Sequence, residues 1–218
     1  MRSARRGISV GDFKAMPYSE KYDIVLDNIT FGERLTADFI RRHLGDQAST
    51  ELREAYQEGI KPIPEDASAE EKYETAYGNW IWMGKTDFDF IREHMGEEGI
   101  DQFVDFEVEA LKRKNASPSL FMLGVIRALA PKTAFKMTAK EFAYRLQWIT
   151  PFSVSEIDPG KAVFDIPRCK ILDHPGPDDL CQVGCQGIYP KWVAEQFKVR
   201  MEFDPQGHSC KCTLTPLS

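Results

Sequence analysis

The chain has 218 residues, of which 42% are hydrophobic and 28% charged, values typical of a globular protein with one large domain or two small ones. Its formal net charge of -6 argues against the basic surface that nucleic-acid binding needs, so we expect no nucleic-acid partner. No apolar run approaches the ~20 residues that span a bilayer, and the N-terminus lacks the apolar core of a signal peptide. We therefore expect a cytoplasmic protein with no membrane partner.

The first part of the chain carries helix signals. Residues 1–12 include the basic stretch MRSARRG and are predicted to form a flexible arm, while residues 13–150 are predicted to be mainly helical. SAEE (Ser68–Glu71) reads as a capping box, and TAKE (Thr138–Glu141) repeats that pattern before another apolar run. Ser117 followed by Pro118 predicts a third helix start. The proline-containing stretch IKPIPEDAS predicts a linker between early helices.

The apolar period changes from 3.6 to 2 after residue 151, so residues 151–218 are predicted to form a small antiparallel sheet. KVRMEF and CKCTLT both alternate, and DPQG (Asp204–Gly207) predicts the type I turn of a hairpin between them. KAVFDIPRCKIL is a third strand candidate, which Pro167 would restrict to an edge or a bulge. IYPKWVAEQF predicts a short helix from Pro190. The predicted fold class is α+β, with a helical N-terminal half packed on a C-terminal sheet in one integrated domain.

All five cysteines lie between Cys169 and Cys212, and three interpretations stay open. An odd number in a reducing compartment indicates thiols or metal ligands rather than disulfides. Cysteine can fill a core as a small apolar residue. Cysteine can also bind zinc in a tetrahedral site, in which His174 or His208 could replace one sulfur ligand. We therefore expect either no cofactor or a zinc ion. Cysteine can also act as a nucleophile where a cation, a histidine or a helix N-terminus lowers the thiol pKa. The predicted zinc ligands are Cys181, Cys185, Cys210 and Cys212.

The C-terminal motifs carry a resemblance to a known family. LCQVGCQG, then FKVRMEF, then GHSCKCTL resemble the L-2-amino-thiazoline-4-carboxylic acid hydrolase family, and the likeness extends over roughly residues 78–216. That family has a cysteine entering a helix, here Cys181 or Cys185, and a last strand that begins as in Gly207–Cys210. In that family the last cysteine is usually followed by an acidic and then an aromatic residue, whereas this chain has Lys211 and Cys212 at these positions. The layout is also similar to 4-vinyl reductase-type ligand-binding domains, some of which are sensors with a structural zinc.

The resemblance implies a hydrolase acting on a C–N bond of a small cyclic or amide-like substrate, with a cysteine thiolate as the candidate nucleophile. His208 would serve as general base and acid, because the unperturbed pKa of histidine lies near neutral pH. Arg168 would hold a substrate carboxylate. The alternative is a small-molecule-binding or sensor domain with a zinc site, and a third possibility is an accessory protein without chemistry. The candidate catalytic residues are Cys181, Cys185, His208 and Cys210, and the candidate substrate-binding residues are Trp80, Trp148, Arg168 and Tyr189.

Aromatic residues are the candidates for the walls of a ligand pocket. Trp80 and Trp82 are two residues apart, so on a helix at ~100° per residue they point about 160° away from each other. One of them at most can face a given pocket. The other needs a different surface, such as that of a second copy in a homodimer.

Overall fold

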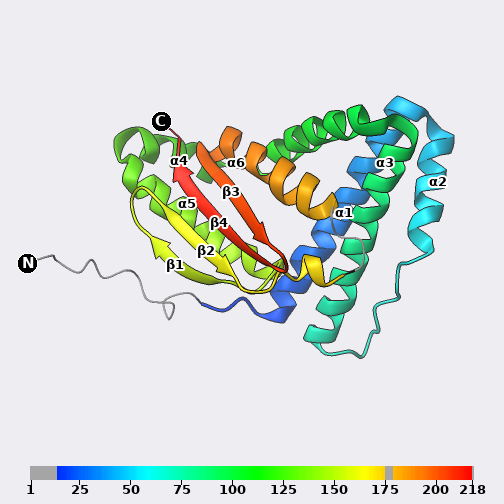
Figure 1. The fold of residues 1–218 in the computed structure, drawn as a ribbon, viewed down its shortest axis with the longest axis horizontal. Helices are drawn as coiled ribbons and strands as arrows, with labels where there is room; N and C mark the ends of the chain where they lie inside the picture. The colour runs from blue at the N-terminus through cyan, green and yellow to red at the C-terminus, as the bar shows by residue number, and fades with distance from the viewer. Residues whose placement is uncertain (1–13, 175–178, 218) are drawn as a thin grey trace, which may run out of the picture. The chain divides into compact units, whose positions relative to one another are not determined.

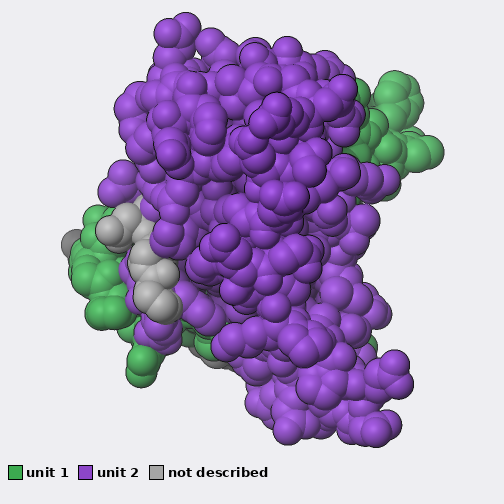
Figure 2. Space-filling view, turned by 90° about the vertical axis from the view of Figure 1, so that its right-hand side faces the viewer, with its two compact units in different colours: residues 1–15, 111–170, 189–218 green, residues 16–110, 171–188 purple. Residues whose placement is uncertain are grey.

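The computed structural model describes residues 14–174 and 179–217 (Figure 1), and the chain divides into two compact units (Figure 2). Unit 1 contains residues 1–15, 111–170 and 189–218, and unit 2 contains residues 16–110 and 171–188. The α+β class predicted from the sequence is confirmed, since helices dominate the first part of the chain and four antiparallel strands follow. The predicted arm of residues 1–12 lies outside the described residues.

Unit 2 is helical (Figure 1). Its elements are α1 (Tyr18–Leu44), α2 (Asp46–Gln57), α3 (Ala69–Lys114, whose last turn belongs to unit 1), the short 3-10 helix η3 (Ile171–Asp173) and the π-helix η4 (Leu180–Ile188). Leu35 and Phe39 are buried in α1, and the residue after that helix is Gly45, whose φ of 91° suits glycine. Fully buried side chains include Val25, Phe39, Ile40, Leu52, Tyr77 and Ile91.

The start and the bend of α3 have local causes. The capping box is confirmed, because the Ser68 N–H donates to Glu71 Oε2 at 2.9 Å and the Glu71 N–H donates to Ser68 Oγ at 3.3 Å. The Ser68 hydroxyl also donates to Glu71 Oε2 at 2.7 Å, and this bond, followed by the one from the Ser68 N–H, lowers the pKa of the exposed Glu71. The predicted linker lies between α2 and α3 as expected. Within α3, Gly96 has a φ of 67°, so the helix bends there at a residue without a Cβ.

Unit 1 contains α4 (Pro118–Leu129), α5 (Pro131–Arg145), η2 (Leu146–Trp148) and α6 (Tyr189–Phe197) together with the sheet. The strands are β1 (Ser153–Ile157), β2 (Ala162–Ile166), β3 (Val199–Gln206) and β4 (Ser209–Pro216), in the order β1-β2-β4-β3 (Figure 1). Helix α5 buries its apolar face on the sheet. The core that results includes Phe135, Ala139, Phe142, Val154, Phe164, Val193, Met201, Cys212 and Leu214.

The predicted hairpin of β3 and β4 is confirmed, but its turn lies further along the chain than DPQG. Gln206 pairs with Ser209, so the loop is Gly207–His208, and Gly207 takes the positive φ of 63° that a tight hairpin favours. Pro205 remains inside β3, paired with Cys210. A strand tolerates proline there because β3 lies at the edge of the sheet.

Several other predicted ends of helices and strands were wrong or only partly right, because of residues next to those ends. Strand β2 is central rather than an edge, because it ends at Ile166 and leaves Pro167 outside. Thr138 starts no helix: α5 begins at Pro131, and the Thr138 hydroxyl donates to the Ala134 carbonyl one turn back at 3.0 Å. Pro118 is the first residue of α4 as predicted, although the Ser117 side chain does not cap it. Strand β1 was not predicted.

No helix in the described ranges has both the length and the apolar composition needed to cross a bilayer.

Candidate functional site

A cleft of about 620 Å³ opens in unit 2 along one face of α3. Its lining residues on α3 follow the helical spacing i, i+4, i+7 and i+11, as Gly78, Trp82 and Lys85 illustrate. The opposite wall comes from the end of α2, the linker and the segment after η3. The lining consists of Gly59, Lys61, Glu74, Thr75, Gly78, Asn79, Ile81, Trp82, Lys85 and His174.

The indole of Trp82 is held in place from two sides. Its ring N–H donates to the Tyr56 carbonyl at 3.1 Å, at the C-terminal end of α2. A Cβ on Gly59 would lie 2.3 Å from Cε2 of the Trp82 ring, so only a glycine allows the backbone to approach this closely. The ring is therefore fixed in orientation while it remains partly exposed to the cleft.

Asn79 joins the linker to α3. Its side chain is 4% exposed, and its amide oxygen accepts the Lys61 backbone N–H at 2.9 Å while its amide nitrogen donates to the Lys61 carbonyl at 2.8 Å. A buried amide with both groups satisfied costs little and specifies one backbone position. This pairing places Lys61 at the mouth of the cleft while its ammonium group stays exposed.

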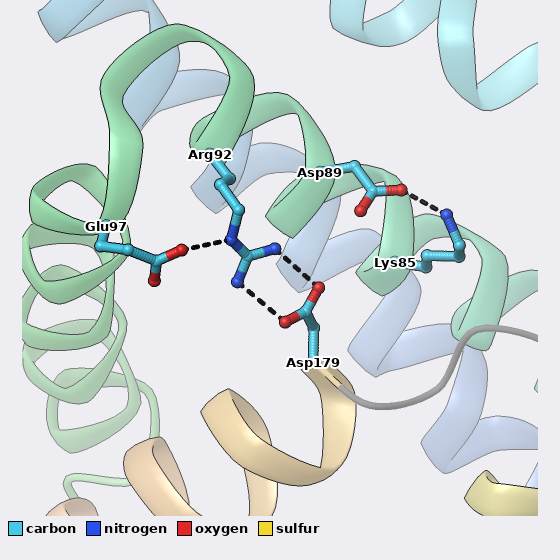
Figure 3. Close-up of polar contacts among 5 residues, drawn as sticks. All are labelled: Lys85, Asp89, Arg92, Glu97 and Asp179. Carbon is cyan, nitrogen blue, oxygen red and sulfur yellow. Dashed lines mark hydrogen bonds and ion pairs between the residues drawn. The ribbon is translucent and has the colours of Figure 1, made fainter.

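The cleft combines an aromatic surface with charged and titratable groups. Lys61 and Lys85 contribute cations, Glu74 contributes a carboxylate and His174 an imidazole. Lys85 also forms an ion pair with Asp89, one turn along α3 (Figure 3). The His174 ring lies 5.8 Å from the ring of Tyr77, measured between centroids. Such a site can hold a small planar molecule with an anionic group.

Asp87 is buried in unit 2, in a hydrogen-bond network that joins α1, α2 and α3. It accepts a hydrogen bond from the Tyr56 hydroxyl on α2, and another from the Thr36 hydroxyl on α1 at 3.1 Å. Burial raises the pKa of the Asp87 carboxyl to about 8, the two hydrogen bonds oppose that rise, and the nearby Glu107 and Glu33 add to it. Burial also raises the pKa of Glu107 to about 7. Unit 2 therefore holds two carboxyl groups that titrate near neutral pH.

A second polar contact fixes η4 on α3 (Figure 3). The guanidinium of Arg92 donates to both carboxylate oxygens of Asp179, at 2.7 and 2.8 Å, and its Nε donates to Glu97 at 2.6 Å. A bidentate pair of this kind restrains orientation as well as distance. Glu97 follows the bend at Gly96, so the same arginine spans the bend and holds the segment that starts η4.

The sequence-predicted residues Cys181 and Cys185 lie in η4, and both are partly exposed. The amide nitrogen of Gln186 approaches Cys181 Sγ at 3.5 Å. π-Helical segments are rare and are frequent at functional sites. Trp80 also belongs to unit 2, where its ring lies 5.5 Å from that of Tyr77, and the cleft is lined by Trp82 instead.

The other predicted site residues lie in unit 1. His208 is exposed in the hairpin turn, and its carbonyl accepts the Cys169 N–H at 2.6 Å, which brings this turn next to Arg168. Cys210 is partly exposed on β4. Trp148 is buried at 6% exposure, and Tyr189 packs against the core of the unit.

Cys212 is fully buried between Phe164 and Phe203 on the neighbouring strands. Burial, and then the neighbouring Cys210, raise the pKa of its thiol, which keeps it protonated at neutral pH. The four predicted zinc ligands are divided equally between the units. Within each unit taken alone, the described residues contain no group of three or more His, Cys, Asp or Glu side chains that could hold a metal ion. The four-sulfur site stays a prediction.

Sequence reasoning did not assign Lys61, Asn79 or Lys85 to a site. The spacing of Asn79, Trp82 and Lys85 on one helical face was a signal that could have suggested a common surface. Nothing in the sequence indicated that Asn79 would hold the linker, because that contact joins residues far apart along the chain.

Comparison of the chain with protein-family models, with curated proteins and with solved structures finds no match.

Replacing Gly59 by alanine should damage the cleft. The added Cβ would clash with the Trp82 ring, so we expect a loss of stability of roughly 1–3 kcal/mol and an altered tryptophan fluorescence spectrum. Gly78→Ala is the control, because nothing lies within 4 Å of its Cβ and alanine favours a helix by up to about 1 kcal/mol. Urea unfolding of both variants measures the difference, and equal stabilities would contradict the proposed contact.

Unit 2 should lose stability as the pH rises from 5 to about 8, because the folded state keeps on Asp87 a proton that the unfolded chain has released. Each such group contributes a slope of about 1.4 kcal/mol per pH unit between its unfolded and folded pKa values. In Asp87→Asn the slope should fall by about half between pH 5 and 7, where Glu107 still contributes, and should disappear between pH 7 and 8. Asp101→Asn, on the exposed side of α3, is the matched control. Free energies of unfolding across this pH range test the prediction, which fails if all three proteins show the same slope.

Proposed function

We propose that the protein binds a small planar organic anion in the cleft of unit 2. The observation that carries this proposal is the cleft itself, whose volume of about 620 Å³ falls within the range of small-molecule sites. The fixed ring of Trp82 offers a stacking surface, and Gly78 leaves room beside it because it has no side chain. Lys61 and Lys85 would bind the anionic group, and His174 would exchange a proton with the ligand.

Ligand binding should depend on the exposed cation at the mouth of the cleft. Lys61→Met keeps the aliphatic stem and the backbone contacts with Asn79 but removes the charge, so we expect ten- to a hundredfold weaker binding of cyclic carboxylates. Lys72→Met, on α3 but outside the lining, should bind normally. Titration calorimetry with a panel of aromatic and heterocyclic carboxylates measures this. If no member of the panel binds, or if Lys61→Met binds as well as Lys72→Met, the proposal is wrong.

A second function, C–N bond hydrolysis by a cysteine thiolate, is favoured by η4. This π-helix presents two partly exposed thiols in the unit that contains the cleft and His174. Cys181 is the better candidate for the nucleophile, because its sulfur accepts a hydrogen bond from the side-chain amide of Gln186 at 3.5 Å. We propose that the sequence-based expectation of a hydrolase acting on a small cyclic or amide-like substrate applies here.

The reaction would proceed in two steps. The thiolate would attack the electrophilic carbon between the heteroatoms, and the C–N bond would break as its nitrogen takes a proton from His174, which lies in the same unit. Water would then add to the carbon that is bonded to sulfur and release the thiolate, with the proton of the water returned to the histidine. Cys185 and Cys210 stay predicted members of the site, as do Arg168 and Tyr189.

Thiol reactivity separates a catalytic cysteine from a structural one. We expect iodoacetamide at neutral pH to modify Cys181 first and Cys212 not at all, because Cys212 is buried and protonated. Gln186→Leu should slow the alkylation of Cys181 without changing that of Cys185. Cys181→Ser should abolish hydrolysis of 2-amino-thiazoline-type carboxylates, whereas Cys169→Ala, a change outside the site, should retain it. Full activity in Cys181→Ser would exclude this nucleophile.

The zinc alternative has an independent test. Elemental mass spectrometry of protein purified without chelator should find about one zinc per chain if Cys181, Cys185, Cys210 and Cys212 share an ion, and Cys210→Ser should lose it. If the purified protein contains no zinc, the zinc alternative is excluded and the thiolate mechanism remains the proposed role of these cysteines. All five are free thiols in the structure, which supports our proposal of a cytoplasmic location.

A further inference from the structure

Helix α4 exposes a stripe of large apolar side chains that no other part of the described chain covers. No residue of α4 is buried, and the exposed fractions are 75% for Phe121, 54% for Met122, 39% for Val125 and 81% for Leu129. At ~100° per residue these four positions fall within an arc of about 100° on one face of the helix. Met137, on α5, adds a fifth exposed apolar side chain at 48%. We call these five residues the apolar stripe.

This exposure is specific to α4. The neighbouring helix α5 buries Phe135, Ala139 and Phe142 in the core of unit 1, as an amphipathic helix should. Among described residues outside α4 and α5, the only large apolar side chain with comparable exposure is Tyr18, at 38%. Contiguous apolar surface of this kind marks an interaction site in a folded protein.

Basic residues accompany the apolar stripe. No aspartate or glutamate occurs between Glu109 and Glu141, although the chain as a whole has 34 acidic residues and a net charge of -6. Within this stretch Lys132, Lys136 and Lys140 follow one another at four-residue intervals along one face of α5. The side chains of these lysines, and that of Arg113, form no hydrogen bond or ion pair with any residue in the described ranges.

We propose that α4 and α5 form a docking surface for an anionic lipid bilayer, with the apolar stripe entering the interface and the three lysines contacting the headgroup phosphates. A helix with apolar side chains on one face and nearby cations is the form that interfacial membrane helices take. Anionic lipids attract such cations, and the attraction adds to the burial of the apolar side chains. A surface that only touches a bilayer needs no spanning helix.

Two features favour a bilayer over a protein partner. A symmetric contact between two copies would place the same lysines of both chains at one interface, where like charges repel. On α4 the apolar stripe extends over about 12 Å, at 1.5 Å per residue from Phe121 to Leu129, and its two most exposed side chains lie at the ends of this part. A linear, exposed stripe suits a fluid surface that adapts its shape to the protein.

The test is co-sedimentation of the full chain with vesicles of phosphatidylcholine alone and of phosphatidylcholine mixed with phosphatidylglycerol. We expect binding to the mixed vesicles, little binding to the neutral ones, and release by high salt. The double variant Phe121→Ser/Leu129→Ser and the triple variant Lys132→Glu/Lys136→Glu/Lys140→Glu should each bind at least tenfold more weakly. Lys72→Glu, which changes an equivalent charge in unit 2, should bind like the unmodified chain.

Circular dichroism of each variant verifies that it is folded, which we expect because all substituted side chains are exposed or half-buried. Absence of binding to either vesicle would overturn the proposal, as would equal binding to both. A dimer in light scattering that the double variant dissociates, together with no vesicle binding, would assign the apolar stripe to a second copy instead. These measurements are independent of the cleft and of its ligand, because they need neither.

Discussion

The buried carboxyl of Asp87 is the constraint on which unit 2 depends. A carboxyl group in an apolar interior is unfavourable unless it is protonated or fully hydrogen-bonded, and the hydroxyls of Tyr56 and Thr36 supply its two partners. These bonds join α1, α2 and α3 at one point. They also fix Tyr56, whose carbonyl accepts the indole N–H of Trp82 at the cleft. The orientation of the aromatic wall therefore follows from a polar contact one layer deeper in the unit.

A second constraint determines where the cysteine-bearing helix lies. Unit 2 is discontinuous in sequence, since residues 171–188 join a body made of residues 16–110. The bidentate contact of Arg92 with Asp179 attaches this returning segment next to the bend at Gly96 (Figure 3). Gly84 contributes as well, because a Cβ there would lie 2.7 Å from the Leu180 side chain. A π-helix with two thiols is thus held on α3 by one ion pair and one close contact.

Unit 1 is organised differently from unit 2. Its sheet and α5 enclose a conventional apolar core in which Cys212 behaves as a small hydrophobe. Helix α4 takes no part in that core, yet its sequence is among the most apolar in the chain. Exposed positions on a helix are usually polar, and the apolar stripe is therefore the feature that supports our proposal of a docking surface.

The sequence by itself determined the secondary structure where the signals are local. The capping box at Ser68 and the alternation in β3 and β4 each depend on neighbours a few residues away, and the structure confirms both. The hairpin turn was misplaced by two residues, because whether Pro205 can stay in a strand depends on that strand being an edge. Only the tertiary structure decided the cleft, the Asp87 network and the attachment of η4. Those contacts join residues 18 to 87 positions apart, and no local pattern records which distant side chain will meet another.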